Sequence, residues 1–151
     1  MLRDNFPVDV FANRLRNEAS VERKIFTSVI DACPRIATLR KAGRANRLDQ
    51  LLTNAAWTDA ALTVISMELP TWTVRRLAYE DGKWVCSLSH QANLPSVLDD
   101  TVDFNHSVLP LAILGAVIEA RARAYTCLPL AQSEPQIKAQ PEHVFCCDNF
   151  A

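Results

Sequence analysis

A histidine and two cysteines near the end of the chain have the spacing of metal ligands. His143, Cys146 and Cys147 lie within five residues, and imidazole and thiolate are ligands that zinc prefers. A closed tetrahedral site needs a fourth ligand, which Cys33, Cys127 or a distant histidine would have to supply. No two cysteines have the CxxC spacing of common zinc sites. The cluster predicts zinc or thiol chemistry as one alternative, and a small hydrophobic anchor that packs onto the domain as the other.

Three aspartates follow the spacing DDxxD between Asp99 and Asp103. Carboxylates at this spacing can hold Mg²⁺ against a pyrophosphate when they share one face of a helix. Here the motif precedes a predicted helix and has no second acidic motif to work with. We therefore expect a solvated acidic loop beside a helix N-terminus, where the helix dipole favours carboxylates.

Cys86 and His90 have the residue types of a nucleophile and its base. The hairpin predicted below turns Cys86 inward, however, which favours an inert buried thiol. The sequence contains no GxSxG, HExxH or glycine-rich nucleotide motif. Its three glycines in 151 residues exclude loops that need several glycines to approach a phosphate closely. These observations favour a protein that is not an enzyme, and no cofactor is expected unless the cysteine cluster binds zinc.

Five basic residues are concentrated between residues 35 and 47. On a continuous helix Arg40, Arg44 and Arg47 would share one face, which suits contact with phosphates or with an acidic protein. The formal net charge of −1 gives the chain no global basic field, so nucleic acid is the less favoured partner. We expect this segment to be a docking surface for a protein, with nucleic acid as the alternative.

The clearest structural signal is an antiparallel β-hairpin, with strands at about 72–80 and 83–89. They flank Asp81-Gly82, a pair that favours the two-residue type I′ turn because both positions need a positive φ. If the last residue before this turn faces the first one after it, Arg75 lies opposite Leu88.

This register sorts the hairpin into two faces. One face collects the apolar side chains of Leu77, Tyr79, Trp84, Cys86 and Leu88. The other face is mostly polar. It also carries Trp72 and Val74, at the end of the first strand away from the turn, and Val85 on the second strand. We expect these side chains to form an exposed apolar patch, and patches of this kind usually mark contact with another chain.

Helical periodicity accounts for most of the remaining chain. It predicts three helices before the hairpin, at about 13–30, at about 35–52 with a break or bend near Gly43, and at about 58–69. After an irregular connection at 91–105 it predicts a further helix at about 108–125. The first three turns of that helix are apolar on every side, so it should be buried in the domain core or, less favoured, in an interface between copies. The predicted fold is α+β: N-terminal helices and the hairpin packed on the buried helix form one domain at 1–125, followed by a proline-punctuated tail at 126–151.

The odd number of cysteines, five, and their irregular spacing indicate free thiols in a reducing cytoplasm. The first residues lack the apolar stretch of a secretory signal, and the longest apolar run, 108–118, is too short to span a bilayer. We therefore expect a small cytoplasmic, non-catalytic protein that contacts another protein or itself. A metal- or thiol-dependent protein is the first alternative and a nucleic-acid binder the second.

Overall fold

The computed structural model describes residues 8–95 and 97–126, and the side chains as far as residue 124. In this part of the chain the element order is α1 (Val8–Asn17), α2 (Arg23–Asp31), α3 (Pro34–Lys41), α4 (Asn46–Thr53), α5 (Trp57–Glu68), β1 (Thr73–Glu80), β2 (Lys83–Ser89), β3 (Thr101–His106) and α6 (Leu109–Thr126).

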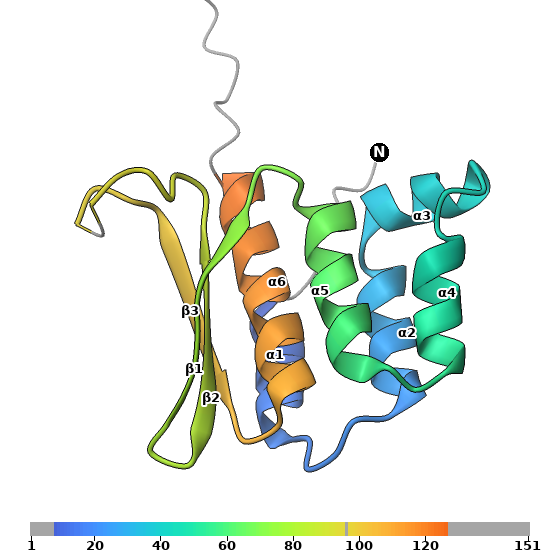
Figure 1. Ribbon diagram of the computed structural model, residues 1–151, viewed down its shortest axis with the longest axis horizontal. Helices are drawn as coiled ribbons and strands as arrows, with labels where there is room; N and C mark the ends of the chain where they lie inside the picture. Colours follow the sequence, from blue (N-terminus) through green and yellow to red (C-terminus); the bar gives the residue numbers. More distant parts are fainter. Residues whose placement is uncertain (1–7, 96, 127–151) are drawn as a thin grey trace, which may run out of the picture.

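The elements form a sheet backed on one side by helices (Figure 1). The sheet is antiparallel, with strand order β1-β2-β3. Helix α6 packs on β2 and β3 with α1 beside it, while α5 packs on α6 from the side away from the sheet. Helices α3 and α4 pack on α5, furthest from the strands. The α+β class and the hairpin on a buried helix are thus confirmed, and α6 lies between the sheet and α5.

The hairpin turn has the predicted geometry. Asp81 and Gly82 have φ of 50° and 78°, both in the left-handed region that the type I′ turn requires. Glu80 pairs with Lys83, as expected. The expectation of an irregular segment at 91–105 is wrong for its second half, because Thr101–His106 forms β3 and pairs with β2. The alternation of buried and more exposed residues along β3 has the period of two that a half-buried strand produces.

One predicted pairing in the hairpin is also wrong. The register shifts between Val74 and Arg76, so Val74 and not Arg75 lies opposite Leu88. Such a β-bulge inserts one extra residue, and every side chain beyond it changes face. Trp72 therefore enters the core, with a relative exposure of 6%. The predicted outer patch does not form, since Trp72 is buried and Val74 shares the face of Leu88.

Helix α6 is the centre of the core. The hydrophobic residues between Leu111 and Ile118 are each at most 1% exposed. The approach of the helix to β3 is so close that a Cβ added to Gly115 would lie 2.2 Å from the ring of Phe104. Glycine is needed here for the close contact of helix and strand. The prediction of a buried helix is confirmed, and the elements of the chain itself surround it.

Five helices, not three, precede the sheet in the described chain. The predicted second helix is interrupted at Gly43, whose φ is 69°, as its sequence indicated. The first predicted helix is in fact two helices, α1 and α2, which pack on different neighbours: α1 on α6 and α2 on α3. Between them Ala19 and Ser20 are exposed, so no continuous apolar stripe holds the segment in one helix.

A buried ion pair joins three helices at the back of the core. Arg121 of α6 lies 3.3 Å from Glu68 of α5 (Nε to Oε1), and the two side chains are 9% and 5% exposed. The other carboxylate oxygen of Glu68 accepts the Ile36 N–H at 3.1 Å, which satisfies a donor in the first turn of α3. Arg121 also donates to the Ala32 carbonyl. Burial raises the pKa of Glu68, and the Ile36 N–H and Arg121 oppose that rise.

Breaking the buried pair should be far more costly than breaking a surface pair. Glu68→Gln leaves the Arg121 charge without a counter-charge, so the free energy of unfolding should fall by about 3–5 kcal/mol. Glu18→Gln removes the exposed partner of Arg14 and should change it by less than about 1 kcal/mol. Urea denaturation of both variants measures the difference. Equal effects would contradict a structural role for the buried pair.

Gly115→Ala should destabilise the protein although alanine favours helices. The gain in helix propensity is about 1 kcal/mol, whereas the clash with Phe104 should cost about 1–3 kcal/mol more than that gain. In a Phe104→Leu background the same substitution should cost clearly less, because the ring is gone. Denaturation of the four proteins in this cycle gives both values, and an equal cost in the two backgrounds would disprove the contact.

Candidate interaction surface

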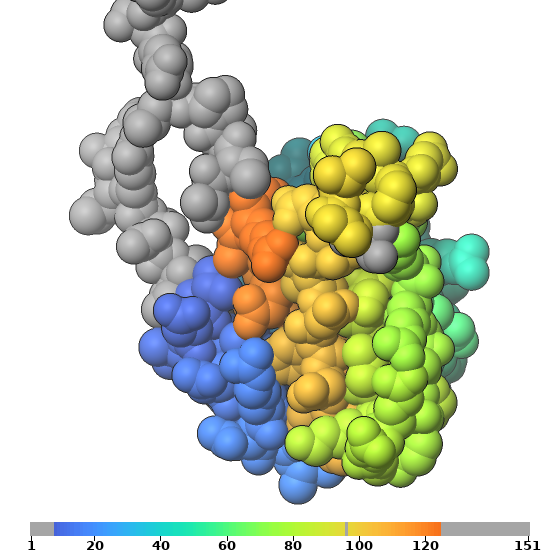
Figure 2. Space-filling model, turned by 90° about the vertical axis from the view of Figure 1, so that its left-hand side faces the viewer, coloured from blue at the N-terminus to red at the C-terminus, as the bar shows by residue number. Residues whose placement is uncertain are grey.

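The described helices leave the side of the sheet opposite α6 uncovered (Figures 1 and 2). We call it the open sheet face. It carries the alternate residues of the strands that do not face the core, and most of them are polar. From the register they are Thr73, Arg76, Ala78, Glu80, Lys83, Val85, Ser87, Ser89, Thr101, Asp103 and Asn105.

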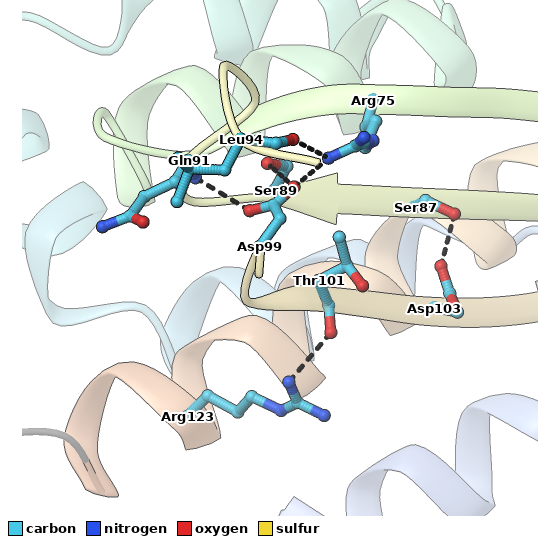
Figure 3. Close-up of polar contacts among 9 residues, drawn as sticks. All are labelled: Arg75, Ser87, Ser89, Gln91, Leu94, Asp99, Thr101, Asp103 and Arg123. Atoms are coloured by element: carbon cyan, nitrogen blue, oxygen red, sulfur yellow. Dashed lines mark hydrogen bonds and ion pairs between the residues drawn. The ribbon is translucent and has the colours of Figure 1, made fainter. Parts of the chain in front are cut away.

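At one end of this face Asp99 organises the bulge and the loop that follows β2 (Figure 3). Its carboxylate pairs with Arg75 and accepts hydrogen bonds from the Ser89 hydroxyl at 2.6 Å and the Gln91 N–H at 3.1 Å. Arg75 also donates to the Leu94 carbonyl at 3.3 Å. The Asp99 side chain is fully enclosed, and the hydrogen bond from Ser89, followed by Arg75 and Gln91, lowers the pKa of that carboxyl.

Further along the face the polar groups pair in the same local way. The Ser87 hydroxyl donates to Asp103 across β2 and β3. Arg76 pairs with Glu80 along β1. Because these carboxylates are each engaged by a neighbouring donor, the arrangement resembles a structured surface more than a set of groups converging on one reacting atom.

Strand β1 is an edge of the sheet, and its apolar side chains are exposed. Val74, Leu77 and Tyr79 point toward the helix side of the sheet by their pairing, yet they are 39%, 37% and 60% exposed. Among the described elements β1 packs extensively only on β2, so it extends beyond the helices. This strand combines exposed apolar area with a backbone edge that no other described strand pairs, as binding strands do.

A shallow hollow lies beside the start of β1. It is lined by Thr71, Thr73, His90, Gln91, Ala92, Asn93 and Leu94. His90 is the one titratable residue among these, and its ring stacks edge-on against Trp72 with 5.4 Å between centroids. Lacking a described carboxylate or thiol in its lining, the hollow offers no pair for acid–base or nucleophilic catalysis.

The three arginines predicted to share a helix face are separated by the break at Gly43. Arg40 lies at the end of α3, Arg44 in the turn, and Arg47 in the first turn of α4. All three are exposed, and Arg40 pairs with Asp49 at 2.7 Å. The three side chains therefore lack the single helix face that a continuous helix would give them, while binding at this surface stays a prediction.

The other predicted chemical sites have different outcomes. His143, Cys146 and Cys147 lie outside the described residues, so their zinc or thiol role stays a prediction. Within the described residues no three His, Cys, Asp or Glu side chains gather as a metal site would require.

The DDxxD aspartates are directed to different partners. Asp99 binds Arg75, Asp100 lies 2.6 Å from Arg123, and Asp103 accepts from Ser87. Asp99 and Asp100 lie in the loop before β3, as predicted, but the Asp99 side chain is enclosed rather than solvated. Asp103 lies in β3, so the three carboxylates do not share the helix face that the magnesium hypothesis requires.

The two described thiols are buried and free, and burial raises the pKa of both Cys33 and Cys86 to about 12. Since the thiolate is the reactive form, both are chemically inert, as predicted for Cys86. His106, the last residue of β3, accepts the Val108 N–H on Nδ1 at 2.9 Å, just before α6 begins.

Comparisons of the chain with protein-family models, with curated proteins and with solved structures give no significant match. Across residues 8–95 and 97–126, no helix has both the length and the hydropathy needed to cross a membrane.

The role of Ser89 in the Asp99 network can be measured by titration. A carboxyl whose pKa is lowered on folding stabilises the native state above its ordinary pKa, and that contribution is lost as the pH falls through the native value. Ser89→Ala should raise the pKa of Asp99 and reduce this acid-sensitive contribution. Ser87→Ala, whose hydroxyl serves Asp103, should leave the Asp99 titration unchanged. NMR titration of the carboxyl carbons distinguishes the two, and an unmoved Asp99 in Ser89→Ala would refute the assignment.

Proposed function

We propose that this protein is non-catalytic and acts by contacting another polypeptide through the exposed edge of β1. The observation that carries the proposal is the combination found on β1: half-exposed apolar side chains together with backbone groups that no described strand pairs. Backbone hydrogen bonds supply affinity in strand addition, and alternate side chains supply specificity.

The orientation of the free backbone groups follows from the turn. In a two-residue hairpin the pair that closes the turn, Glu80 with Lys83, exchanges hydrogen bonds. Hydrogen-bonded and non-bonded pairs then alternate, so Leu77 and Tyr79 direct their N–H and C=O groups away from β2. The same two residues carry exposed apolar side chains. A partner strand would thus find backbone donors, acceptors and apolar contacts at the same two positions.

The chemistry of the described residues supports a binding role. The buried thiols have raised pKa values, and the carboxylates of the open sheet face are engaged in local pairs. We place the protein in a reducing cytoplasm, because Cys33 and Cys86 are free and the odd number of cysteines gives no disulfide framework.

Site-specific photo-crosslinking tests the proposal. Replacing Tyr79 with p-benzoyl-phenylalanine should yield adducts with a polypeptide in cells of origin, whereas the same probe at exposed Thr53 of α4 should not. Leu77→Pro removes an N–H that points away from β2, a change that an edge strand tolerates. It should reduce the Tyr79 adducts about fivefold or more, the equivalent of one hydrogen bond.

Mass spectrometry of the adducts identifies the polypeptide, and circular dichroism checks that Leu77→Pro remains folded. Equal adduct yields at positions 79 and 53 would overturn the proposal, as would adducts that a folded Leu77→Pro variant leaves undiminished.

A further inference from the structure

The charges on β1 are complementary to those of a second β1 running in the opposite direction. Arg76 and Glu80 lie on the open sheet face, with Ala78 midway between them. They carry opposite charges and are 54% and 44% exposed. If two copies of the strand pair antiparallel about a two-fold axis at Ala78, Arg76 of each copy faces Glu80 of the other.

The backbone limits the possible registers. Strands pair through the residues whose backbone groups point outward, here Leu77 and Tyr79. Three two-fold registers satisfy this condition, centred on residues 77, 78 and 79. Centring on 77 sets Arg76 against Ala78, and centring on 79 sets Arg76 against the Gly82 turn. Only the register centred on Ala78 places both charged residues opposite a countercharge.

The same register also completes the apolar side of the strand. Leu77 of each copy would hydrogen-bond through its backbone with Tyr79 of the other, and the two side chains would lie across from each other on the helix side of the sheet. Cross-strand pairs of an aromatic and an aliphatic residue stabilise antiparallel sheets. Two half-exposed Leu77 side chains and two Tyr79 rings would thus be covered in one contact.

We propose that the partner of the β1 edge is a second copy of this chain, joined by antiparallel pairing of β1 about Ala78 into a continuous six-stranded sheet. This inference rests on the proposed function and names its partner. The contact is isologous, since the same strand is used by both copies, and it closes as a two-fold dimer.

Charged residues on an edge strand can instead serve to prevent pairing. Protection of that kind works best when pairing would bring like charges together. On β1 the favoured register brings opposite charges together at two symmetric places. Within one copy Arg76 and Glu80 already pair, so dimerisation exchanges these ion pairs, and the net gain comes from the backbone bonds and the apolar contacts.

Charge reversal separates contacts between copies from contacts within one. In an Arg76→Glu dimer, two carboxylates face each other at each of the two places where residue 76 of one copy meets residue 80 of the other. In a Glu80→Arg dimer, two guanidinium groups face each other at the same two places. Each variant alone should weaken the dimer about tenfold. Mixed one to one, the two variants form a heterodimer in which both places again hold opposite charges, so its affinity should return to near the wild-type value.

The readout is sedimentation velocity over a range of protein concentrations, with circular dichroism to check that each variant is folded. Both single variants lack the Arg76–Glu80 pair within the chain, and mixing cannot restore it. Recovery of dimers in the mixture therefore supports pairing between copies. Failure to recover them, or dimers unaffected by either reversal, overturns the inference.

A cysteine at the axis tests the register without changing charges. At a non-hydrogen-bonded pair the two Cα atoms are about 4.5 Å apart, within disulfide range. With Cys127, Cys146 and Cys147 replaced by serine, Ala78→Cys should crosslink to itself under mild oxidation. Arg76→Cys should not, because its equivalent in the other copy lies four residues along the strand. Equal crosslinking of both, or of neither, overturns the register.

The two proposals can fail separately. A wild-type chain that stays monomeric at every concentration, together with Tyr79 adducts to a different protein, overturns the second copy as partner and leaves the proposed function standing. Monomers together with no Tyr79 adducts overturn both.

Discussion

Arg75, the extra residue at the bulge of β1, pairs with Asp99, and the bulge determines which face of the sheet each side chain before it occupies. Side chains alternate between the faces of a strand, so a single extra residue reverses the face of everything beyond it. Without the bulge, Arg75 would point toward the core opposite Leu88 and Trp72 would point away from it. With the bulge, Trp72 is buried and Arg75 reaches an enclosed carboxylate. The bulge therefore places the Trp72 indole in the core instead of the Arg75 guanidinium. This exchange is favourable because it buries apolar area and avoids the cost of desolvating a charge.

The same network attaches the loop after β2 to the sheet. Asp99 holds Arg75, Ser89 and Gln91 together, while its neighbour Asp100 lies beside Arg123 of α6. The loop is thus fixed both to the strand before the turn and to the end of the central helix. One polar cluster thus contacts the bulge, the loop and the residues that lead into β3, whereas the edge of β1 from Leu77 to Tyr79 lies outside it.

The hairpin and the central helix were predictable because their signals are local. Asp81-Gly82 favours a type I′ turn whatever the rest of the chain does. A helix that is apolar on every side is stable in water only when it is buried. The bulge was not predictable, since its extra residue, Arg75, pairs with Asp99, a partner 24 residues away. Strand β3 was not predicted because Asp99, Asp100 and Asp103 favoured an acidic loop, although the alternation of Val102, Phe104 and His106 indicates a strand. The arginine surface stays a prediction, because the interruption at Gly43 places Arg40 and Arg47 on two different helices.

The distribution of reactive groups between core and surface explains why the edge, and not a pocket, is the site that the geometry favours. Cys33, Glu68 and Arg121 lie together in the core, where burial suppresses the thiolate and the ion pair is used to bind the start of α3. On the open sheet face the carboxylates are held by neighbouring serines and arginines. The sheet edge differs from both, because hydrogen-bonding capacity on the outer side of β1 is intrinsic to the backbone and cannot be satisfied by side-chain choice alone. Water can satisfy these groups in the isolated chain, and a polypeptide in extended conformation is the ligand that can replace that water along the strand.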